Sequence, residues 1–208
     1  MSEEPKVNEK QRIRDRMRAL REAVNITDHR TWCNSIRKAC ESLPEMKRSN
    51  MVHIYISAIN NEVDTLGLIL HLFEQGKQVI VPKCSLRSTD IYNIRIYSLE
   101  ELKPAKFGLM EPDFNQEREI MPSQLDIVIV PLLAFDRSGG RIGFGGGYYD
   151  SLLAQCSCPK VGIAFSFQEV GKVPLEAHDQ KLDIIITERE IVRVCNGKEC
   201  NDQGYSRG

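Results

Sequence analysis

A glycine-rich segment, residues 136–150, has the composition of an anion-binding loop. It reads DRSGGRIGFGGGYYD. Glycines let successive backbone amides turn toward a phosphate because no Cβ blocks the approach. Arg141 could neutralise phosphate charge and Asp150 could hold a magnesium ion. The segment is not a Walker A loop, since no Gly-Lys-Ser/Thr follows, nor a dinucleotide fingerprint, since Tyr148 stands where the third glycine belongs. It therefore predicts phosphate binding, with a long structural turn as the alternative.

A basic segment near the N-terminus could supply further cations. Residues 6–22 contain seven basic and three acidic residues, a local excess of 7 − 3 = +4. The spacing of their apolar residues predicts an amphipathic helix with one narrow stripe (Ile13, Met17, Leu20 and Val24). At about 100° per residue, Lys10, Arg14 and Arg21 fall along one edge of that stripe. They could reach an anion, although a merely solvated helix would have the same composition.

The elements that must position these residues alternate between helices and strands. Further helices are predicted over residues 28–43, 66–73 and 148–155, the first of which would complete an N-terminal helical hairpin. Strands are predicted over residues 52–56, 79–81, 91–97, 126–130, 161–164, 183–187 and 191–194. Residues 103–113, which hold two prolines, are expected to form a loop.

This order predicts a three-layer α/β/α fold with a mostly parallel, doubly wound sheet. Strand-helix-strand units imply parallel strands with right-handed crossovers. Residues 126–130 are apolar on both faces, as a central strand covered by helices must be. The glycine-rich segment follows that strand, and open α/β sheets bind ligands at the carboxyl ends of their strands.

Composition narrows the class of protein. A chain of 208 residues, 41% hydrophobic, is expected to form a single domain, with a core over residues 6–195 and a flexible tail over 196–208. Its net charge of -1 offers no overall field for nucleic acid or an anionic membrane. The apolar runs are far shorter than a membrane span, and the acidic N-terminus resembles neither a secretory signal nor a mitochondrial presequence. A cytosolic protein is expected.

The cysteines and histidines add no obvious chemistry. The seven cysteines have no zinc-binding spacing, so reduced thiols are expected. The four histidines are scattered, and no motif pairs one with a nucleophile. Each is expected to be structural or exposed.

Residues 141–150, preceded by Pro131 and Phe135-Asp136, resemble the signature of the 5-formyltetrahydrofolate cyclo-ligase (methenyltetrahydrofolate synthetase) family. Residues 10–14 resemble the family's ATP-contacting segment, residues 62–65 its folate-contacting strand end and residues 108–112 its mid-chain loop. The likeness spans roughly residues 10–188. It implies a NagB/RpiA/CoA-transferase-like fold. Some members carry basic residues at the positions of Phe144 and Gly146.

The resemblance implies an ATP-dependent ligase that forms a C–N bond. In the family reaction the formyl oxygen of 5-formyltetrahydrofolate takes the γ-phosphoryl group of ATP. The substrate nitrogen at position 10 then attacks the formyl carbon, giving 5,10-methenyltetrahydrofolate, ADP and phosphate. Phosphoryl transfer depends mainly on positioning and charge neutralisation, so few catalytic side chains are needed.

The resemblance also implies roles for single residues. Lys10, Arg14 and Arg141 would contact ATP phosphates. The backbone of the loop would cradle them (Gly143, Phe144, Gly145, Gly146, Gly147, Tyr148 and Tyr149). Glu62 would bond the pterin, with Ile56, Phe107 and Tyr148 lining the folate pocket. Arg141 and Tyr148 would be catalytic, the latter by orienting the formyl oxygen, and Asp150 and Asp183 would hold Mg²⁺.

Two other functions stay open. A sugar-phosphate isomerase or CoA-transferase-like enzyme could use the same fold and loop without ATP. An RNA-associated module could use the basic helix, although the chain lacks aromatic-rich strands of the RNP type. The ligase interpretation predicts a monomer that acts on small molecules and has no nucleic-acid or membrane partner.

Overall fold

The structure is a computed structural model and describes residues 9–58, 61–85 and 91–194. In these ranges the α-helices are α1 (Glu9–Glu22), α2 (Ile26–Ser42), α3 (Pro44–Arg48), α4 (Leu66–Glu74) and α5 (Tyr148–Leu153). The strands are β1 (Met51–Ile54), β2 (Gln78–Cys84), β3 (Ile91–Ile96), β4 (Leu102–Pro104), β5 (Met110–Pro112), β6 (Ile127–Pro131), β7 (Ala134–Phe135), β8 (Arg141–Ile142), β9 (Lys160–Ile163), β10 (Ile184–Ile186) and β11 (Ile191–Arg193). The tail predicted over 196–208 lies outside the described residues.

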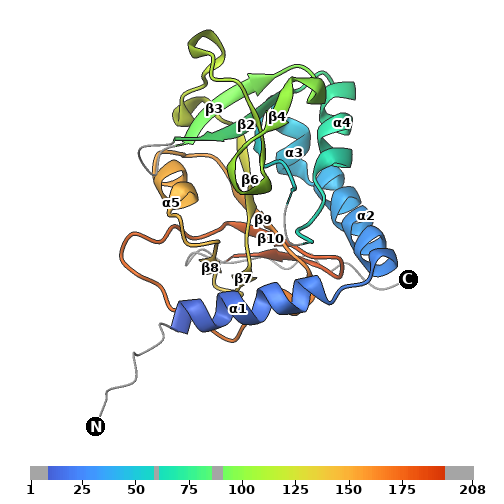
Figure 1. Cartoon of the computed structure of the whole chain (residues 1–208), viewed down its shortest axis with the longest axis vertical. Helices are drawn as coiled ribbons and strands as arrows, with labels where there is room; N and C mark the ends of the chain where they lie inside the picture. Colours follow the sequence, from blue (N-terminus) through green and yellow to red (C-terminus); the bar gives the residue numbers. More distant parts are fainter. Residues whose placement is uncertain (1–8, 59–60, 86–90, 195–208) are drawn as a thin grey trace.

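A seven-stranded sheet forms the centre of the molecule (Figure 1), in the order β11-β10-β9-β6-β1-β2-β3. The five inner strands are parallel, and β11 and β3 pair antiparallel at the two edges. The apolar strand β6 is the fourth of the seven, as its sequence predicts for a strand covered on both faces. The mixed, mostly parallel sheet confirms the α/β class.

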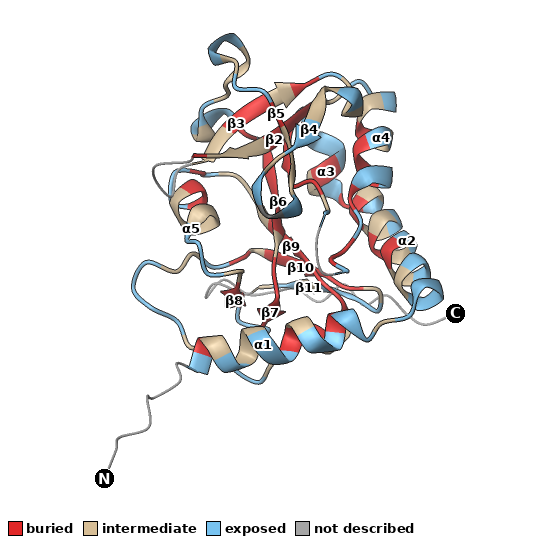
Figure 2. Ribbon diagram, in the orientation of Figure 1, coloured by how far each residue is buried: buried red, intermediate tan, exposed pale blue. Residues whose placement is uncertain are grey.

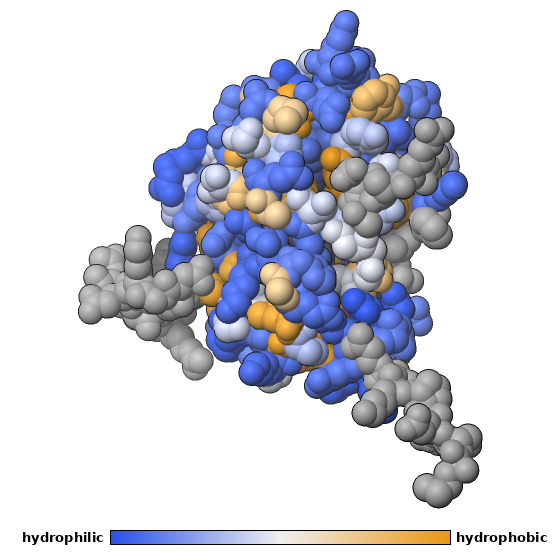
Figure 3. Space-filling model, turned by 90° about the vertical axis from the view of Figure 1, so that its left-hand side faces the viewer, coloured by the Kyte–Doolittle hydropathy of each residue, from blue (hydrophilic) through white to orange (hydrophobic). Residues whose placement is uncertain are grey.

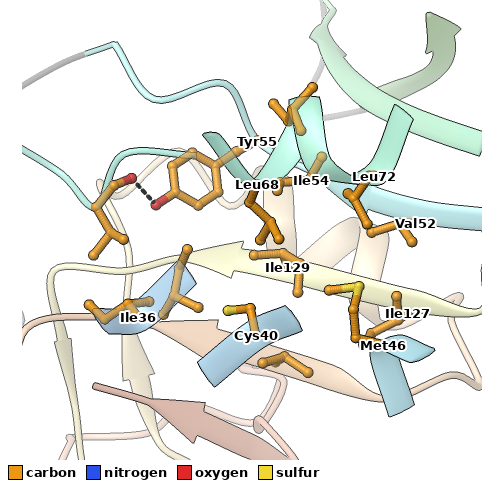
Figure 4. Packing of buried hydrophobic residues seen from close by; sticks show 14 of the residues in the cluster. Ile36, Cys40, Met46, Val52, Ile54, Tyr55, Leu68, Leu72, Ile127 and Ile129 are labelled. Carbon is orange, nitrogen blue, oxygen red and sulfur yellow. Dashed lines mark hydrogen bonds between the residues drawn. The ribbon is translucent and has the colours of Figure 1, made fainter. Parts of the chain in front are cut away.

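Helices cover both faces of the sheet because alternate strand residues point to opposite sides. Val52 and Ile54 of β1 face one side and pack in a cluster with residues of α2, α3 and α4 (Figure 4). Val128 and Val130 of β6 face the other side and pack in a cluster with residues of α5. Figure 2 shows buried residues concentrated in the central strands.

Local signals explain where several helices begin and end. The side chain of Asn25 accepts a hydrogen bond from the Asp28 amide at 2.9 Å, which caps the start of α2. Pro44 stops α2 but also begins the short helix α3, in whose first turn its missing N–H is not needed. Gly76 has a φ of 67° just beyond α4, where the sequence predicts a glycine that ends the helix.

The predicted N-terminal helical hairpin is not confirmed. Met17 of α1 is buried against residues that follow β6, among them Leu133 and Ile142. Helix α2 instead packs with α3, α4 and β10. Figure 1 accordingly shows α1 beside β7 and β8, and α2 along the side of the sheet. The two amphipathic helices bury their apolar faces in different parts of the molecule.

The prediction of a loop over residues 103–113 was wrong in part. Residues 102–104 and 110–112 pair as the antiparallel strands β4 and β5, with Leu102 opposite Pro112 and Pro104 opposite Met110. Proline is tolerated at the ends of such an isolated two-stranded ribbon because no further strand needs its missing N–H. This ribbon forms one wall of the cavity described below.

The face shown in Figure 3 is largely hydrophilic, and its hydrophobic residues form small separate patches. Within the described ranges, none of the helices combines the length and the apolar character needed to cross a membrane.

Candidate active site

A cavity of about 920 Å³ opens at the carboxyl ends of the parallel strands. Residues at or just beyond the ends of β1, β2 and β6 form its floor, including Tyr55, Cys84 and Pro131. Helix α1, the β4–β5 ribbon, the glycine-rich loop and residues 176–179 form its walls. Segments far apart in sequence therefore meet where an α/β sheet places its ligands.

Most of the predicted site residues line this one cavity. They are Lys10, Arg14, Ile56, Glu62, Arg141, Gly143, Phe144, Gly145, Gly146, Gly147, Tyr148, Tyr149 and Asp150. The side chain of Phe107 lies outside the described part of the structure, although its neighbours Lys106 and Leu109 line the cavity.

Asp136 shapes the turn that presents Arg141. Its carboxylate accepts hydrogen bonds from the amides of Ser138 (2.8 Å), Gly140 (3.1 Å) and Val173 (2.7 Å). A Cβ on Gly140 would lie 2.6 Å from this carboxylate, so the turn requires glycine there. Burial alone would raise the pKa of Asp136, but these hydrogen bonds hold it below its usual value. The turn joins β7 to β8, which places Arg141 at the cavity.

The glycine-rich loop is held from outside by α1. The Arg14 Nε donates to the carbonyl of Gly143 at 3.0 Å, and a Cβ on Gly145 would lie 3.4 Å from the Arg14 guanidinium carbon. Gly145 and Gly147 have φ values of 106° and 71°, which side-chain-bearing residues rarely adopt. Phe144 packs against α1, with the guanidinium of Arg21 5.7 Å from its ring centroid. Loop and helix thus form one unit.

One end of the cavity gathers cations that are paired with carboxylates. Lys10 Nζ lies 2.7 Å from Asp179 and 3.4 Å from Glu176. Arg141 Nη2 lies 2.6 Å from Asp150, which also accepts from the Gln180 amide at 3.2 Å. Burial lowers the pKa of Arg141, and the charge of Asp150 opposes that shift. This end therefore combines buried cations, which suit phosphate, with carboxylates that already neutralise them.

The cavity also contains Glu62 and several apolar lining residues. Pro82, Ile91 and Met110 are among its lining residues. The Glu62 side chain accepts from the Ala58 amide at 2.8 Å, and its carbonyl lies 3.0 Å from His29 Nε2. A carboxylate held in this way can accept hydrogen bonds from a flat, nitrogen-rich ring.

The two adjacent tyrosines of α5 have different surroundings. The ring of Tyr148 covers Gly146, where a Cβ would meet ring carbons at 2.7 Å. The hydroxyl of Tyr149 is buried and has no hydrogen-bond partner among the described residues. The ring of Tyr149 packs edge-on against that of His53, with centroids 5.9 Å apart. Burial raises the pKa of Tyr149 and lowers that of His53 to about 3, so both are neutral near pH 7. The sequence argument assigned only backbone to Tyr149.

The structure does not bring Asp183 to the cavity. Its carboxylate accepts a hydrogen bond from the Lys160 amide at 2.9 Å, where β9 and β10 begin. Those beginnings lie at the amino ends of parallel strands, away from the carboxyl ends that form the cavity. Asp183 therefore does not line the cavity that Asp150 lines, and its role as a magnesium ligand stays a prediction.

Asp179 is one of three acidic lining residues that sequence reasoning missed, together with Glu111 and Glu176. It lines the cavity in the segment before β10, and its side chain is 10% exposed. Burial alone would raise the pKa of Asp179, but hydrogen bonds from Lys10 and the Glu176 amide keep it below its usual value. Topology could have distinguished Asp179 from Asp183. A residue in the loop after a parallel strand can reach the carboxyl edge of the sheet, whereas a residue at the start of the next parallel strand lies at the opposite edge.

Comparisons with known proteins agree with this geometry. The model of the 5-formyltetrahydrofolate cyclo-ligase family matches residues 6–188. A protein of Schizosaccharomyces pombe named probable 5-formyltetrahydrofolate cyclo-ligase is 34% identical over 175 residues, covering 76% of this chain and 85% of the relative. The 5-formyltetrahydrofolate cyclo-ligase of Haemophilus influenzae is 31% identical, covering 85% of this chain and 97% of that protein.

Solved structures show the same likeness. The 5,10-methenyltetrahydrofolate synthetase of Aquifex aeolicus superposes with a TM-score of 0.79 at 32% identity, covering 95% of this chain and 99% of that one. The corresponding synthetase of Mycoplasma pneumoniae gives a TM-score of 0.69 at 27% identity, covering 87% and 99%.

Proposed function

The chain belongs to the 5-formyltetrahydrofolate cyclo-ligase family, and we propose that its cavity converts 5-formyltetrahydrofolate and ATP to 5,10-methenyltetrahydrofolate, ADP and phosphate. The observation that carries this proposal is that one cavity is lined by the glycine-rich loop with Lys10, Arg14 and Arg141 and also by Glu62. The cations suit a polyphosphate and the carboxylate suits a pterin, which the reaction must bring together.

The cationic end would bind and orient the triphosphate. Lys10, Arg14 and Arg141 would neutralise phosphate oxygens, and the loop would approach them closely because its glycines carry no side chains. The formyl oxygen forms a bond to the γ-phosphorus while the bond from that phosphorus to ADP breaks. Charge neutralisation and alignment by these residues would lower the barrier to this transfer.

Ring closure would then use the substrate's own nucleophile. The nitrogen at position 10 attacks the formyl carbon and loses its proton, while the carbon–oxygen bond breaks and phosphate leaves. Glu62 would hold the pterin so that this nitrogen stays close to the carbon, and such proximity is worth up to about 7–11 kcal/mol in well-oriented reactions. Tyr148 stays a candidate for orienting the formyl group, and Tyr149 joins it.

The site fits one magnesium ion carried with the nucleotide. Magnesium is commonly bound through one or two carboxylates together with substrate phosphates. Asp150 and Asp179 both line the cationic end and would hold it, whereas Asp183, the other predicted ligand, does not line the cavity. No group of three or more metal-binding side chains exists in the described residues. The ion would supply charge neutralisation when bound.

The alternatives are less well supported. The family match favours the cyclo-ligase over an ATP-independent isomerase or a CoA-transferase. Three of the seven basic residues that suggested RNA binding have other surroundings, since Lys10 and Arg14 line the cavity and Arg21 is buried. The finer NagB/RpiA/CoA-transferase-like fold, a single domain, a monomer and a cytosolic location stay as proposals.

The test is the ATP-dependent appearance of the methenyl product, followed by its ultraviolet absorbance. Lys10→Ala should lower kcat/KM for ATP by about 100-fold, because it removes a cation from the phosphate end. Lys103→Ala is the matched control, since Lys103 pairs with the exposed Asp113 and does not line the cavity. Absence of product from a folded, ATP-binding wild type would overturn the proposal.

A further inference from the structure

The cavity has no formal net charge, although its proposed ligands are strongly anionic. Its described lining includes five basic residues (Lys10, Arg14, Lys83, Lys106 and Arg141) and five acidic residues (Glu62, Glu111, Asp150, Glu176 and Asp179). A formally neutral cavity gives little long-range attraction for a polyphosphate. Affinity must therefore come from short-range contacts, and these depend on which charged groups are available.

Two of the three basic side chains at the cationic end, Lys10 and Arg141, already form ion pairs with carboxylates. The side chains of Lys10 and Asp179 are each 10% exposed, and the two charged groups lie 2.7 Å apart. The side chain of Arg141 is 4% exposed and lies 2.6 Å from Asp150. At such burial the interaction is poorly screened, so a phosphate must displace a carboxylate oxygen to reach either cation.

Displacing these carboxylates leaves them beside the incoming phosphate. A nucleotide without a metal ion would then place its own negative charges near Asp150, Glu176 and Asp179 at low effective dielectric. A divalent cation removes the conflict, because it can take the released carboxylates and phosphate oxygens as shared ligands.

We propose that Asp179, with Glu176 and Asp150, makes the site selective for the metal-complexed nucleotide by occupying the phosphate-binding cations until a divalent ion arrives. The carboxylates act as internal substitutes for phosphate. Nucleotide and metal ion then bind cooperatively. The metal ion draws the carboxylates away from the cations that the phosphates need, and the phosphates draw the cations away from the carboxylates that the metal ion needs. The proposal rests on the proposed function, because it takes this end of the cavity as the nucleotide site.

Asp179 is the residue to change because asparagine can keep its local structure. Its Oδ2 accepts a hydrogen bond from the Glu176 amide at 2.7 Å, and an asparagine carbonyl oxygen can accept the same bond. Asp150 is less suitable, since its replacement would leave the buried Arg141 without the carboxylate that lies 2.6 Å from it.

The experiment measures ADP binding by calorimetry, once in EDTA and once with excess Mg²⁺, at low ionic strength. Wild type should bind ADP much more weakly in EDTA than with Mg²⁺. Asp179→Asn should bind metal-free ADP at least about tenfold more tightly than wild type, because one repulsive charge is gone and Lys10 is released. Its gain in affinity on adding Mg²⁺ should shrink.

Asp113→Asn is the matched control, since it removes one carboxylate from an exposed ion pair that does not line the cavity. It should bind ADP as wild type does under both conditions. Equal or weaker binding of metal-free ADP by Asp179→Asn would overturn the proposal. If Asp179→Asn does not fold, Glu176→Gln replaces it, because that side chain is 53% exposed and the substitution should be tolerated. Loss of the Glu176 charge should also strengthen binding of metal-free ADP, and equal or weaker binding would overturn the proposal.

The two proposals fail in different ways. A wild type that binds no ADP even with Mg²⁺ contradicts the proposed function. A wild type that makes the methenyl product, but whose Asp179→Asn variant gains no affinity for metal-free ADP, contradicts only the selectivity proposal.

Discussion

Two buried tyrosine hydroxyls at the same cavity should respond oppositely to replacement by phenylalanine. The Tyr55 hydroxyl donates to the carbonyl of Val63 at 2.8 Å (Figure 4), whereas the buried Tyr149 hydroxyl has no partner among the described residues. Tyr55→Phe leaves the Val63 carbonyl unsatisfied and should lower the free energy of unfolding by about 1–3 kcal/mol. Tyr149→Phe removes an unsatisfied polar group and should leave stability unchanged or raise it by up to about 1 kcal/mol.

The assay is urea unfolding of both variants and wild type at neutral pH. Burial raises the pKa of both hydroxyls well above the usual value, so both stay protonated and the comparison is free of titration. The midpoints should differ while the m-values stay equal, because the surface exposed on unfolding is nearly the same. A Tyr149→Phe protein as destabilised as Tyr55→Phe would refute the reasoning. If the Tyr149 hydroxyl contacts substrate, Tyr149→Phe should also lose activity despite its unimpaired stability.

Three further predictions concern the loop, its turn and the proposed metal site. Gly145→Ala should raise KM for ATP, because a φ of 106° strains alanine by about 1–3 kcal/mol and shifts the loop. An unchanged KM would contradict this. The pKa of Asp136 is lower in the folded than in the unfolded state, where it is about 4. The carboxylate therefore stabilises the fold above about pH 4, and this stabilisation is lost as the pH falls through the folded-state pKa. The free energy of unfolding of Asp136→Asn should accordingly fall less steeply between pH 7 and pH 2 than that of wild type. Asp183→Asn should lower the free energy of unfolding, because it weakens the hydrogen bond from the Lys160 amide. It should keep the Mg²⁺-dependent affinity for ADP. A large loss of that affinity would show that Asp183 is a metal ligand.

The features that could be predicted from sequence depend on local patterns. The uninterrupted apolar run of β6 identified the central strand, because only a strand covered on both faces needs one. The glycines of the loop predicted backbone conformations that other residues avoid, and Gly145 and Gly147 have them. Two positions on one edge of α1, Lys10 and Arg14, were predicted from helical spacing and line the cavity.

The features that could not be predicted depend on contacts between distant segments. The amphipathic stripe of α1 shows that Met17 is buried but not that it packs against residues after β6 instead of α2. Adjacent tyrosines on a helix point about 100° apart, yet the sequence does not say which one faces the core. The bond between Lys10 and Asp179 joins residues 169 positions apart, and no local pattern encodes it.

The most direct test of the central claim follows the formyl oxygen. The proposed reaction transfers it to the γ-phosphoryl group, so 5-formyltetrahydrofolate labelled with heavy oxygen in the formyl group should yield labelled inorganic phosphate. One labelled phosphate should form for each methenyl product and each ADP. Unlabelled phosphate, formed by the purified protein together with methenyl product, would show that water and not the formyl oxygen attacks ATP, and would contradict the account.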